Sequence, residues 1–491
     1  MQDTALSGNV EPGSADVPLA VDLDGTFLRT DVLLEGLAAA ITRAPWLFLL
    51  APFLLLIEGK AGLKRRLARA GLVDLATLPV RRPLAEWLAE ERARGRKIYL
   101  VSASDQEIVD RIAAVHGLFD GAIGSDGHAN LKGPAKRDRL QKLFPEGYAY
   151  VGDAGADIAV WKSAQRVSFA GRQAGTLRKM QELKKPVERI FFERAAPLET
   201  WAKAARVHQW AKNALIFAAP IVAQRAMVPE HWLNWVMCLL GFLIINLLAS
   251  STYILNDLAD LSADRQHWSK RNRPFASGAL PISIALILIP IGIVIGAVAA
   301  VLLDREFAIT VGTYLVVTLA YSFKLKQIPV VDVLTLATLF TLRLLMGLAL
   351  INVEPTPWIL GFCLMLFLSL SLAKRHVELH RKAQLGGGDV PGRGYRSDDA
   401  VFVLCMGVAS GFAAILVVML YVADKQVVGL YKTPHWLWAL PVVFYVWLGR
   451  IWFLCHRGRL DDDPVLFAIK DPLSIILGFL AAGSFALAAL A

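Results

Sequence analysis

Long apolar stretches set the later part of this 491-residue chain apart from its first 205 residues. About nine of them follow residue 205, running roughly over 211–224, 232–257, 281–303, 307–323, 329–350, 357–373, 399–421, 434–455 and 472–490. Several are long enough to cross a bilayer, which takes about 20 apolar residues in a helix. The first is short, and we expect it to be partly re-entrant. The pattern therefore predicts a soluble domain followed by an all-α polytopic membrane bundle of about nine transmembrane helices.

Basic residues are distributed unequally among the loops of the predicted bundle. Alternate loops, at 258–280, 324–328, 374–398 and 456–471, hold 15 Lys and Arg, and the other loops hold 4. Lys and Arg concentrate on the cytoplasmic side of membrane proteins. The formal charge of +10 is explained in the same way and indicates anionic lipid rather than nucleic acid as the partner. We therefore expect a multi-pass protein of a bacterial inner membrane, with the amino-terminal domain and the polar loops on the cytoplasmic side.

The amino-terminal part alternates between strand-like and helix-like segments. Short apolar strands are predicted at 19–23, 97–101 and 148–151, each followed by small or acidic residues. This order favours a Rossmann-like, doubly wound parallel sheet with its chemistry at the carboxyl edge. The apolar segment 44–57 is too short to span a bilayer, and we interpret it as helices of a cap that rests on the membrane. The predicted boundaries are a polar tail at 1–18, the α/β domain at 19–175 with its cap at about 33–90, a linker at 176–205 and the membrane domain at 206–491.

Four chemically distinct motifs follow one another along the α/β domain. Asp22-Leu-Asp24-Gly-Thr ends the first strand and Ser102 ends the second. Lys136 lies in a later Asn-Leu-Lys-Gly-Pro-Ala-Lys segment, and Asp153 and Asp157 follow the third strand. Two carboxylates spaced two apart on an extended segment point the same way, where Mg2+ can bridge one of them to a phosphate. In order and context these motifs resemble those of the haloacid-dehalogenase-like phosphohydrolases, over residues 19 to about 175.

The resemblance implies a role for each motif. Asp22 is implied as the nucleophile that forms an aspartyl-phosphate, and Asp24 as the general acid and base. Ser102 and Lys136 would neutralise phosphate oxygens, with Lys132 as a rival for the lysine role. Asp22, Asp24, Asp153 and Asp157 are the implied Mg2+ site. The alternative interpretation is a retained but inactive scaffold.

An acidic cluster marks the end of the second apolar stretch. Asn256, Asp257, Asp260 and Asp264 lie between apolar residues 232–255 and a basic run that begins at Arg265. On a helix Asn256, Asp260 and Asp264 share one face because they are four residues apart. Oxygen ligands of this kind hold Mg2+, which in turn holds a pyrophosphate, and carboxylates so close to hydrocarbon are costly. The alternative is a solvated loop that is acidic by chance.

The cluster resembles the first aspartate-rich motif of the UbiA-like intramembrane prenyltransferase superfamily, over about residues 205–490. The segment 206–213 (Arg-Val-His-Gln-Trp-Ala-Lys-Asn) matches the entry to that superfamily's first helix, and 321–326 (Tyr-Ser-Phe-Lys-Leu-Lys) with Asp332 matches a later cytoplasmic end. The resemblance implies departure of pyrophosphate from an allylic or anomeric carbon, with Mg2+ and basic residues neutralising the leaving group.

One loop departs from the pattern of the aromatic prenyltransferases in that superfamily. Where they carry a second aspartate-rich motif, this chain has Lys374, Arg375 and Glu378 without a DxxxD pair. Cations there suggest direct binding of further phosphate groups. This is similar to the polyprenyl-phosphate phosphoribosyltransferases of the decaprenyl-phosphate type, whose donor, phosphoribosyl pyrophosphate, and acceptor, a polyprenyl phosphate, both carry such groups.

The resemblance therefore assigns candidate roles beyond the metal ligands. It implies transfer of 5-phosphoribose to a polyprenyl phosphate. Because a phosphatase-like domain is fused to a transferase whose implied product carries a phosphomonoester, our hypothesis is that the α/β domain removes that 5-phosphate, giving a precursor for cell-envelope glycans. One alternative is a prenyltransferase that uses a prenyl diphosphate and an aromatic or other acceptor. Another is a non-catalytic lipid-binding or transport role. Besides the substrates, the partners we consider are membrane lipids and a second copy of the chain in a homo-oligomer. Each basic candidate could instead anchor the bundle in anionic headgroups. The substrate-binding candidates are Lys212, Asn256, Lys270, Arg271, Arg273, Tyr321, Lys326, Lys374, Arg375 and Glu378.

Overall fold

The computed structural model describes most of the chain, in two compact units. The described residues are 17–125, 131–223, 231–267, 270–384, 386–390, 393–429, 431–460, 467 and 470–490. One unit comprises Met1–Ala205 and Tyr253–Ile289, and the other comprises Arg206–Thr252 and Pro290–Ala491. The predicted tail at 1–18 lies almost entirely outside the described residues.

The first unit is built on a parallel sheet of six strands. The sheet has the strand order β3-β2-β1-β4-β5-β6, and every neighbouring pair is parallel. The three predicted strands are confirmed as β1, β2 and β4, which lie side by side in its centre. Their carboxyl ends therefore meet at one edge, where the order of the strands reverses. The strands are β1 (Leu19–Asp22), β2 (Ile98–Asp105), β3 (Gly121–Ser125), β4 (Ala149–Gly152), β5 (Arg166–Gly171) and β6 (Val187–Phe192).

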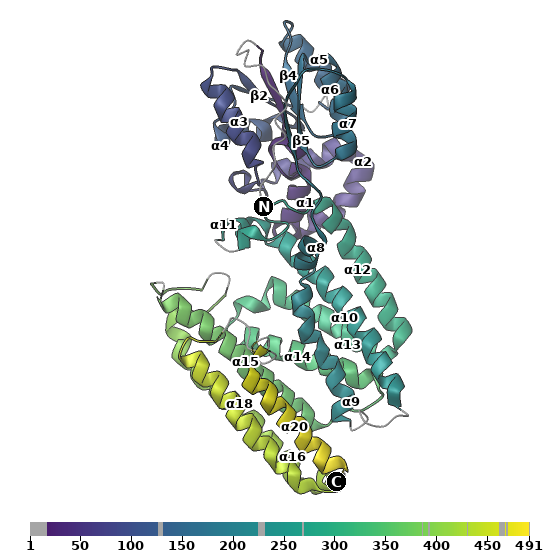
Figure 1. Ribbon diagram of the computed structural model, residues 1–491, viewed down its shortest axis with the longest axis vertical. Coiled ribbons are helices and arrows are strands. Elements are labelled where there is room, and N and C mark those ends of the chain that lie inside the picture. Colours follow the sequence, from purple (N-terminus) through teal and green to yellow (C-terminus); the bar gives the residue numbers. More distant parts are fainter. Residues whose placement is uncertain are drawn as a thin grey trace. The chain divides into compact units, whose positions relative to one another are not determined.

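Helices cover both faces of this sheet (Figure 1). On one face α3 (Arg82–Ala93) and α4 (Gln106–His116) bury Trp87, Leu88 and Ile112 against β1 and β2. On the other face α5 (Pro134–Leu143), α6 (Ile158–Ser163) and α7 (Ala174–Glu182) pack on β4 and β5. This two-sided cover explains why the central strands are apolar on both sides.

The sheet extends past the predicted domain boundary at residue 175. Strand β6 falls inside the predicted linker 176–205, and α8 (Leu198–Ala204) follows it. The strand is fixed by a buried ion pair between Glu188 and Arg96, with Nη2–Oε1 at 2.9 Å, and by Phe191 against Trp87. These partners are about 100 residues away in sequence, so local composition did not reveal the strand.

The predicted cap corresponds to two helices inserted between β1 and β2. Helix α1 (Val32–Arg43) and helix α2 (Pro45–Arg69) pack on each other through Ala40, Ala44, Leu47 and Leu63. A one-turn helix at Leu75–Thr77 follows. The cap is shorter than the predicted 33–90, because α3 packs on the sheet as part of the core.

The segment Tyr253–Ile289 belongs to the same unit as the α/β domain. It holds the end of α10 (Trp232–Ala259), α11 (Leu261–Gln266), a short turn at Lys270–Asn272 and the start of α12 (Ile282–Leu303). Arg265 of α11 forms a buried ion pair with Glu35 of α1, with Nη2–Oε1 at 2.6 Å. The Arg172 guanidinium also donates to the carbonyl oxygen of Gly278 at 2.5 Å. The α/β domain is therefore fastened to the loop that joins two membrane-spanning helices.

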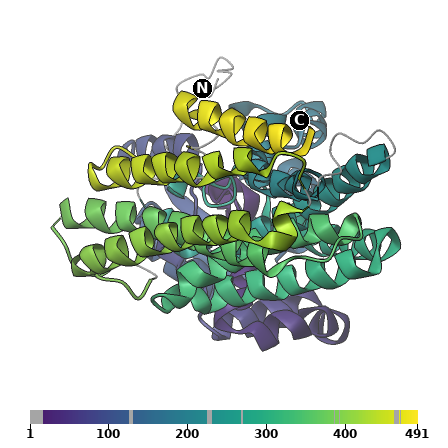
Figure 2. The ribbon, with the colours of Figure 1, turned by 90° about the horizontal axis from the view of Figure 1, so that it is seen from below.

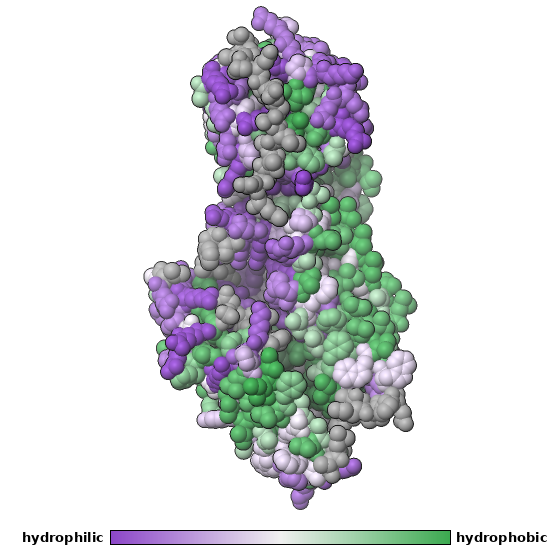
Figure 3. Space-filling view, in the orientation of Figure 1, coloured by the Kyte–Doolittle hydropathy of each residue, from purple (hydrophilic) through white to green (hydrophobic). Residues whose placement is uncertain are grey.

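The second unit is a bundle of long apolar helices. Within the described residues eight helices of the chain are long and apolar enough to span a membrane, fewer than the nine predicted. The predicted first stretch is instead a 3-10 helix (Val207–Phe217) followed by the short α9 (Ala218–Val222). Helix α14 is the most deeply buried of the eight, and Figure 2 shows α16, α18 and α20 running alongside one another. Figure 3 shows apolar surface along α12, as a lipid-facing helix requires. The eight are α10, α12, α13 (Arg305–Phe323), α14 (Val331–Leu350), α15 (Pro357–Gln384), α16 (Ala400–Ala423), α18 (Ala439–His456) and α20 (Pro472–Leu490).

Candidate functional site

The segment after β1 forms a tight turn that places two aspartates at the carboxyl edge of the sheet. Asp22 ends the strand, and the turn Leu23–Phe27 follows. Gly25 adopts φ +82°, which residues with a Cβ rarely adopt. A Cβ there would also lie 2.5 Å from Oδ2 of Asp153. The glycine therefore allows the turn to lie directly against the acidic loop after β4.

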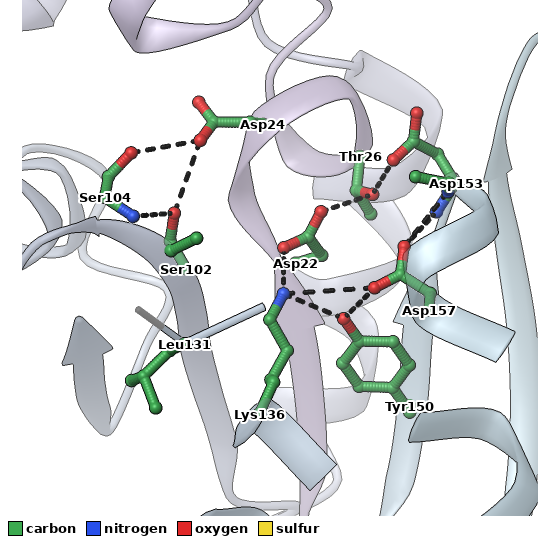
Figure 4. A network of polar contacts seen from close by, with 12 residues as sticks. Asp22, Asp24, Thr26, Ser102, Ser104, Leu131, Lys136, Tyr150, Asp153 and Asp157 are labelled. Carbon is green, nitrogen blue, oxygen red and sulfur yellow. Dashed lines mark hydrogen bonds and ion pairs between the residues drawn. The ribbon is translucent and has the colours of Figure 1, made fainter. Parts of the chain in front are cut away.

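Three carboxylates converge at this edge (Figure 4). Asp22, Asp153 and Asp157 each present an oxygen within 4.8 Å of the others, the one such acidic group found among the described residues. Lys136 of α5 reaches them from below the edge, with Nζ at 2.5 Å from Oδ1 of Asp22. The Tyr150 hydroxyl accepts from Lys136 at 3.1 Å and donates to Oδ1 of Asp157 at 2.6 Å. A cluster of three acids and one lysine has a net negative charge and oxygen donors suited to a hard divalent cation.

Burial and mutual repulsion perturb the acids of this cluster. Burial raises the pKa of Asp22 to about 7, although the Lys136 ammonium opposes the shift. Burial, together with the charges of Asp22 and Asp157, raises the pKa of Asp153 to about 8. Burial disfavours the Lys136 ammonium, but the attraction of Asp22 and Asp157 outweighs it and raises the pKa of that lysine. The site therefore holds carboxyls whose ionisation is unfavourable without a further positive charge.

Asp24 points away from the three-carboxylate cluster (Figure 4). Its Oδ2 accepts from the Ser104 hydroxyl at 3.0 Å and from the Ser102 hydroxyl at 3.4 Å, and its Oδ1 accepts from the Val32 amide at 2.9 Å. The structure thus does not bring the Asp24 carboxylate to the group of acids that the sequence placed with it around a metal. Lys64 of α2 lies 3.9 Å from Asp24 and connects the cap to this side of the site.

The structure distinguishes between the two lysines proposed for the phosphate role. Lys136 is buried against Asp22, whereas Lys132 is exposed and precedes α5.

Four contacting side chains were not assigned roles from sequence. Tyr150 and Gly152 are two residues apart on β4, so they face the same side of the sheet, and the sequence alone could have placed Tyr150 beside the acidic loop. Lys64 carries no such signal, because only the folding of α2 brings it to Asp24. The four are Thr26, Lys64, Ser104 and Tyr150.

The aspartate-rich motif begins on the last turn of α10 and continues onto α11. Asp257 and Asp264 are buried, and Arg273 bridges them with Nη1 at 3.2 Å from the first and 2.6 Å from the second. Burial raises the pKa of Asp264, although Arg273 opposes the shift. Asp260 separates the two helices and leaves the helical conformation, but hydrogen bonds between residues four apart continue on both sides of it, from the Asp260 amide to the Asn256 carbonyl oxygen and from the Asp264 amide to that of Asp260. The predicted spacing of four residues is thus accompanied by hydrogen bonds of the same spacing. The guanidinium of Arg273 lies between the carboxylates of Asp257 and Asp264.

The basic run after this motif divides in two. Arg265 is turned to Glu35 of the α/β domain, and Arg273 is turned to the acids. Lys270 and Arg271 lie between them on an exposed one-turn helix. Of the predicted anion-binding residues in this run, Arg273 is thus the one that contacts the acidic motif directly.

The remaining candidates lie in the second unit. Arg375 is fully buried and pairs with Asp332, with Nη2–Oδ2 at 2.7 Å, and with Glu378. Tyr395 donates its hydroxyl to Asp332 at 2.6 Å, and Arg393 donates to the Tyr321 hydroxyl at 3.1 Å. Arg375 is therefore neutralised within the bundle. Lys212, Tyr321, Lys326, Lys374 and Glu378 are partly exposed.

Arg343 is the charged residue that the sequence places deep in an apolar helix. Its Nε donates to Oδ1 of Asn213 at 2.6 Å and its Nη2 to the Tyr314 hydroxyl at 3.1 Å. Asn213 in turn donates to Asn246 at 2.6 Å. Arg343 therefore satisfies a buried network that connects three helices and the 207–217 segment.

The two units define an integral membrane protein with an amino-terminal α/β domain and a helical membrane bundle. The chain belongs to the UbiA prenyltransferase family, whose model matches residues 214–470, just over half of it. Membership of this family identifies the membrane bundle as that of a transferase.

Individual relatives cover different shares of the chain. An uncharacterized protein of Sinorhizobium fredii is 39% identical over 473 residues, which is 96% of this chain and 91% of the relative. A decaprenyl-phosphate phosphoribosyltransferase of Mycobacterium tuberculosis is 33% identical over 185 residues, 38% of this chain and 61% of that enzyme. A UbiA homolog from Archaeoglobus fulgidus, solved bound to DMAPP and Mg2+, aligns with a TM-score of 0.44 at 16% identity, covering 60% of this chain and 100% of the homolog.

Proposed function

We propose that this protein transfers 5-phosphoribose from phosphoribosyl pyrophosphate to a polyprenyl phosphate and then removes the 5-phosphate of the product. In the first reaction a phosphate oxygen of the lipid bonds to the anomeric carbon while the bond to pyrophosphate breaks. In the second, the α/β domain hydrolyses the phosphomonoester to an alcohol and inorganic phosphate. The observation that carries the proposal is the pairing of Arg273 with Asp257 and Asp264 at the end of a membrane helix.

The acidic motif and its arginine suit a diphosphate bound with a metal. Asp257 and Asp264 supply carboxylate oxygens, and Asn256 precedes Asp257 on α10 while Asp260 stands between α10 and α11. Arg273, already in contact with the acids, and the exposed Lys270 are suited to the outer oxygens of the anion. Similarity to a decaprenyl-phosphate phosphoribosyltransferase, at 33% identity, supports phosphoribosyl pyrophosphate as the donor.

The α/β site suits the hydrolysis of a phosphomonoester through a covalent intermediate. Asp22 holds its carboxylate between Lys136 and the Thr26 hydroxyl, which leaves it oriented for attack on phosphorus. Asp24, on the opposite side, is positioned by Ser104 and the Val32 amide to give a proton to the departing alcohol and later take one from water. Mg2+ fits the grouped acids, and Asp22, Asp153 and Asp157 would hold it. When bound, the metal supplies positive charge for the phosphate oxygens.

Both proposed sites are expected on the cytoplasmic side, where phosphoribosyl pyrophosphate is supplied. This orientation rests on the 15 Lys and Arg of the predicted inner loops against 4 in the others. The attachment of the α/β domain to the α10–α12 loop keeps the two acidic sites within one unit.

A donor screen tests the transferase. Purified protein in lipid nanodiscs is incubated with polyprenyl phosphate and either phosphoribosyl pyrophosphate or a prenyl diphosphate, and the lipids are read by mass spectrometry. A polyprenyl-phosphoryl ribose, formed only with Mg2+ and lost in Asp260→Asn, is the expected result. Product from prenyl diphosphate alone would overturn the proposal.

The second candidate is transfer of an isoprenoid from a prenyl diphosphate to an aromatic or other acceptor. The family description, which is that of prenyltransferases, favours it. The same screen separates the two, because a prenyltransferase consumes the prenyl diphosphate and leaves phosphoribosyl pyrophosphate intact.

A further inference from the structure

The cap helix α2 carries an apolar face that no described part of its own unit covers. Its inner side, at Leu47, Ala51 and Leu63, packs in the cluster with α1. Its outer side is exposed over large apolar residues, and Figure 3 shows apolar surface where Figure 1 places this helix. A soluble domain seldom exposes so many large apolar side chains side by side. The exposed residues are Trp46, Leu49, Leu50, Phe53, Leu55, Leu56 and Ile57.

The helix changes character at Gly59. This residue has φ +67° and ψ −175° inside the helix, so α2 bends there, and Pro52 lies in the first half. Residues 45–57 contain no charge, whereas residues 60–69 contain Lys60, Lys64, Arg65, Arg66 and Arg69 and no acid. The apolar half thus has an exposed apolar face opposite its packed side, and a cationic segment follows it. Apolar side chains of this kind enter the boundary between headgroups and acyl chains, and nearby Lys and Arg side chains are attracted to anionic lipid.

We propose that the apolar half of α2 inserts into the headgroup and upper acyl region of an anionic bilayer, with the cationic half against lipid phosphates. The length of the apolar half, 45–57, is too short to cross a bilayer, so insertion is limited to the interface. The bilayer is at hand, because Arg265 and Glu35 fasten this domain to the loop between two spanning helices. Trp46 and Phe53 are residue types that favour the interface.

Insertion also determines what reaches the α/β site. Lys64 of the cationic half lies 3.9 Å from Asp24, and Lys64 and Leu67 line one cleft together with Ser104 and Ile108. The mouth of the site would then lie at lipid headgroup level, where a phosphomonoester carried on a lipid tail enters without leaving the membrane. This second part rests on the proposed phosphatase function, whereas the insertion of α2 does not.

Fluorescence quenching tests the insertion directly in the full-length protein. Leu56→Cys is labelled with bimane in a Cys405→Ser background, since Cys405 is the exposed one of the four cysteines. The protein is placed in phosphatidylglycerol-containing nanodiscs whose acyl chains carry bromine near the headgroup. Val115→Cys, at an exposed apolar position on α4, is the matched control. We expect quenching at residue 56 about fivefold greater than at residue 115, as for a side chain buried several ångströms into the interface.

Equal quenching at the two positions would overturn the insertion. So would shielding of the bimane at residue 56 from solvent that persists without brominated lipid and increases with protein concentration, because a second copy of the chain would then cover the apolar face. A parallel assay compares Leu49→Glu/Leu56→Glu with Leu143→Glu on a soluble aryl phosphate and on a long-chain alkyl phosphate in vesicles. Loss of about fivefold on the lipid-borne probe alone, in the α2 variant alone, is expected for an interfacial helix. Loss on both probes would overturn the placement of the mouth, and absence of hydrolysis in wild type would refute the phosphatase while leaving the quenching result valid.

Discussion

The two acidic groups of the first unit differ in how ready they are for a divalent cation. Asp22, Asp153 and Asp157 bring oxygens within 4.8 Å of one another at the ends of neighbouring strands. Asp257 on the last turn of α10 and Asp264 on α11 are bridged by Arg273. Parallel strands converge their carboxyl ends without any ligand, whereas the two carboxylates on consecutive helices share the arginine that lies between them. Sheet geometry therefore preforms the first site, and the second needs a ligand to complete it.

The counter-cations differ in the same way. Lys136 is buried, held by Asp22 and Tyr150, and cannot leave without exposing the cluster. The Arg273 side chain is 30% exposed, and Arg273 directly follows the short turn Lys270–Asn272. A permanent lysine suits a site that acts repeatedly on one small group, whereas a movable arginine suits a site that must admit and release a diphosphate. This contrast makes separable predictions for the two halves of the reaction.

The largest effect is expected for Asp22→Asn. Removing the nucleophile should lower hydrolysis of the product phosphomonoester at least about a thousandfold, as with other covalent catalysts, while transfer continues. Mass spectrometry of the labelled lipid should then show the 5-phosphorylated product accumulating. Asp138→Asn, at an exposed carboxylate on α5, is the matched control. A wild-type product pattern in Asp22→Asn would contradict both the phosphatase and its coupling to the transferase.

Asp264→Asn should affect the other half. Transfer should fall about 10²–10³-fold, the usual loss when one group that stabilises leaving-group charge is removed, while hydrolysis of a supplied phosphomonoester is unchanged. Glu306→Gln tests a carboxylate at the exposed start of a spanning helix and should have no effect. Equal losses in both reactions would show that the two sites do not work separately.

Mg2+ should stabilise the first site more at high pH. The pKa values of Asp22 and Asp153, about 7 and about 8 without metal, lie above their usual 3.8. Their contribution to stability is therefore full below the usual pKa of 3.8, falls as the pH rises above it, and is completely lost once the pH has passed 7 to 8, where both carboxyls are ionised in the folded protein too. We expect chelated protein to melt at a lower temperature at pH 8.5 than at pH 6, and Mg2+ to raise that temperature more at pH 8.5. For each proton displaced, Mg2+ affinity should weaken about tenfold per pH unit below these values.

Calorimetry and thermal melts check this dependence. The double variant Asp22→Asn/Asp153→Asn removes both titrating groups and should abolish the extra Mg2+ stabilisation at pH 8.5. A Mg2+-induced gain that is the same at pH 6 and pH 8.5 in wild type would contradict the linkage.

The sequence predicted the positions that local chemistry determines. Asp22 ends one apolar strand and Asp153 directly follows another, and strand ends of a parallel sheet share an edge, so the sequence could predict that the two side chains meet. Asp24 carries the same signal, but a turn through Gly25 directs its carboxylate to Ser104. The direction of a side chain within a turn depends on φ and ψ, which the motif does not specify.

Long-range pairs were beyond what the sequence could predict. Arg375 was expected to bind substrate phosphate, yet Asp332, 43 residues away, takes up its charge inside the bundle. Glu188 and Arg96 add a sixth strand to the sheet across 92 residues. In the sequence, Arg265 begins a basic run that we interpreted as anion-binding. In the structure its partner is Glu35, 230 residues away. A run of basic residues predicts a region that can bind an anion. The tertiary structure determines whether each Lys or Arg pairs with a carboxylate of the protein or is available to a ligand.

Glu35→Gln is expected to change the two reaction rates least. It tests whether the Arg265–Glu35 ion pair holds the two sites in one unit. The Arg265–Glu35 pair is buried, with side-chain exposures of 7% and 4%. Removing one charge from such a pair leaves the other unpaired, at a cost of about 3 kcal/mol, or about a hundredfold in the opening equilibrium. Hydrogen exchange in the segment Tyr253–Ile289 should rise accordingly, while each reaction retains its rate on its own supplied substrate. Glu199→Gln removes the exposed pair with Lys203 and should change nothing. Unchanged exchange in Glu35→Gln would mean that other contacts hold the α/β domain to the α10–α12 loop. The Arg265–Glu35 ion pair would then not be what keeps the Asp22 site and the Asp257–Asp264 site in one unit.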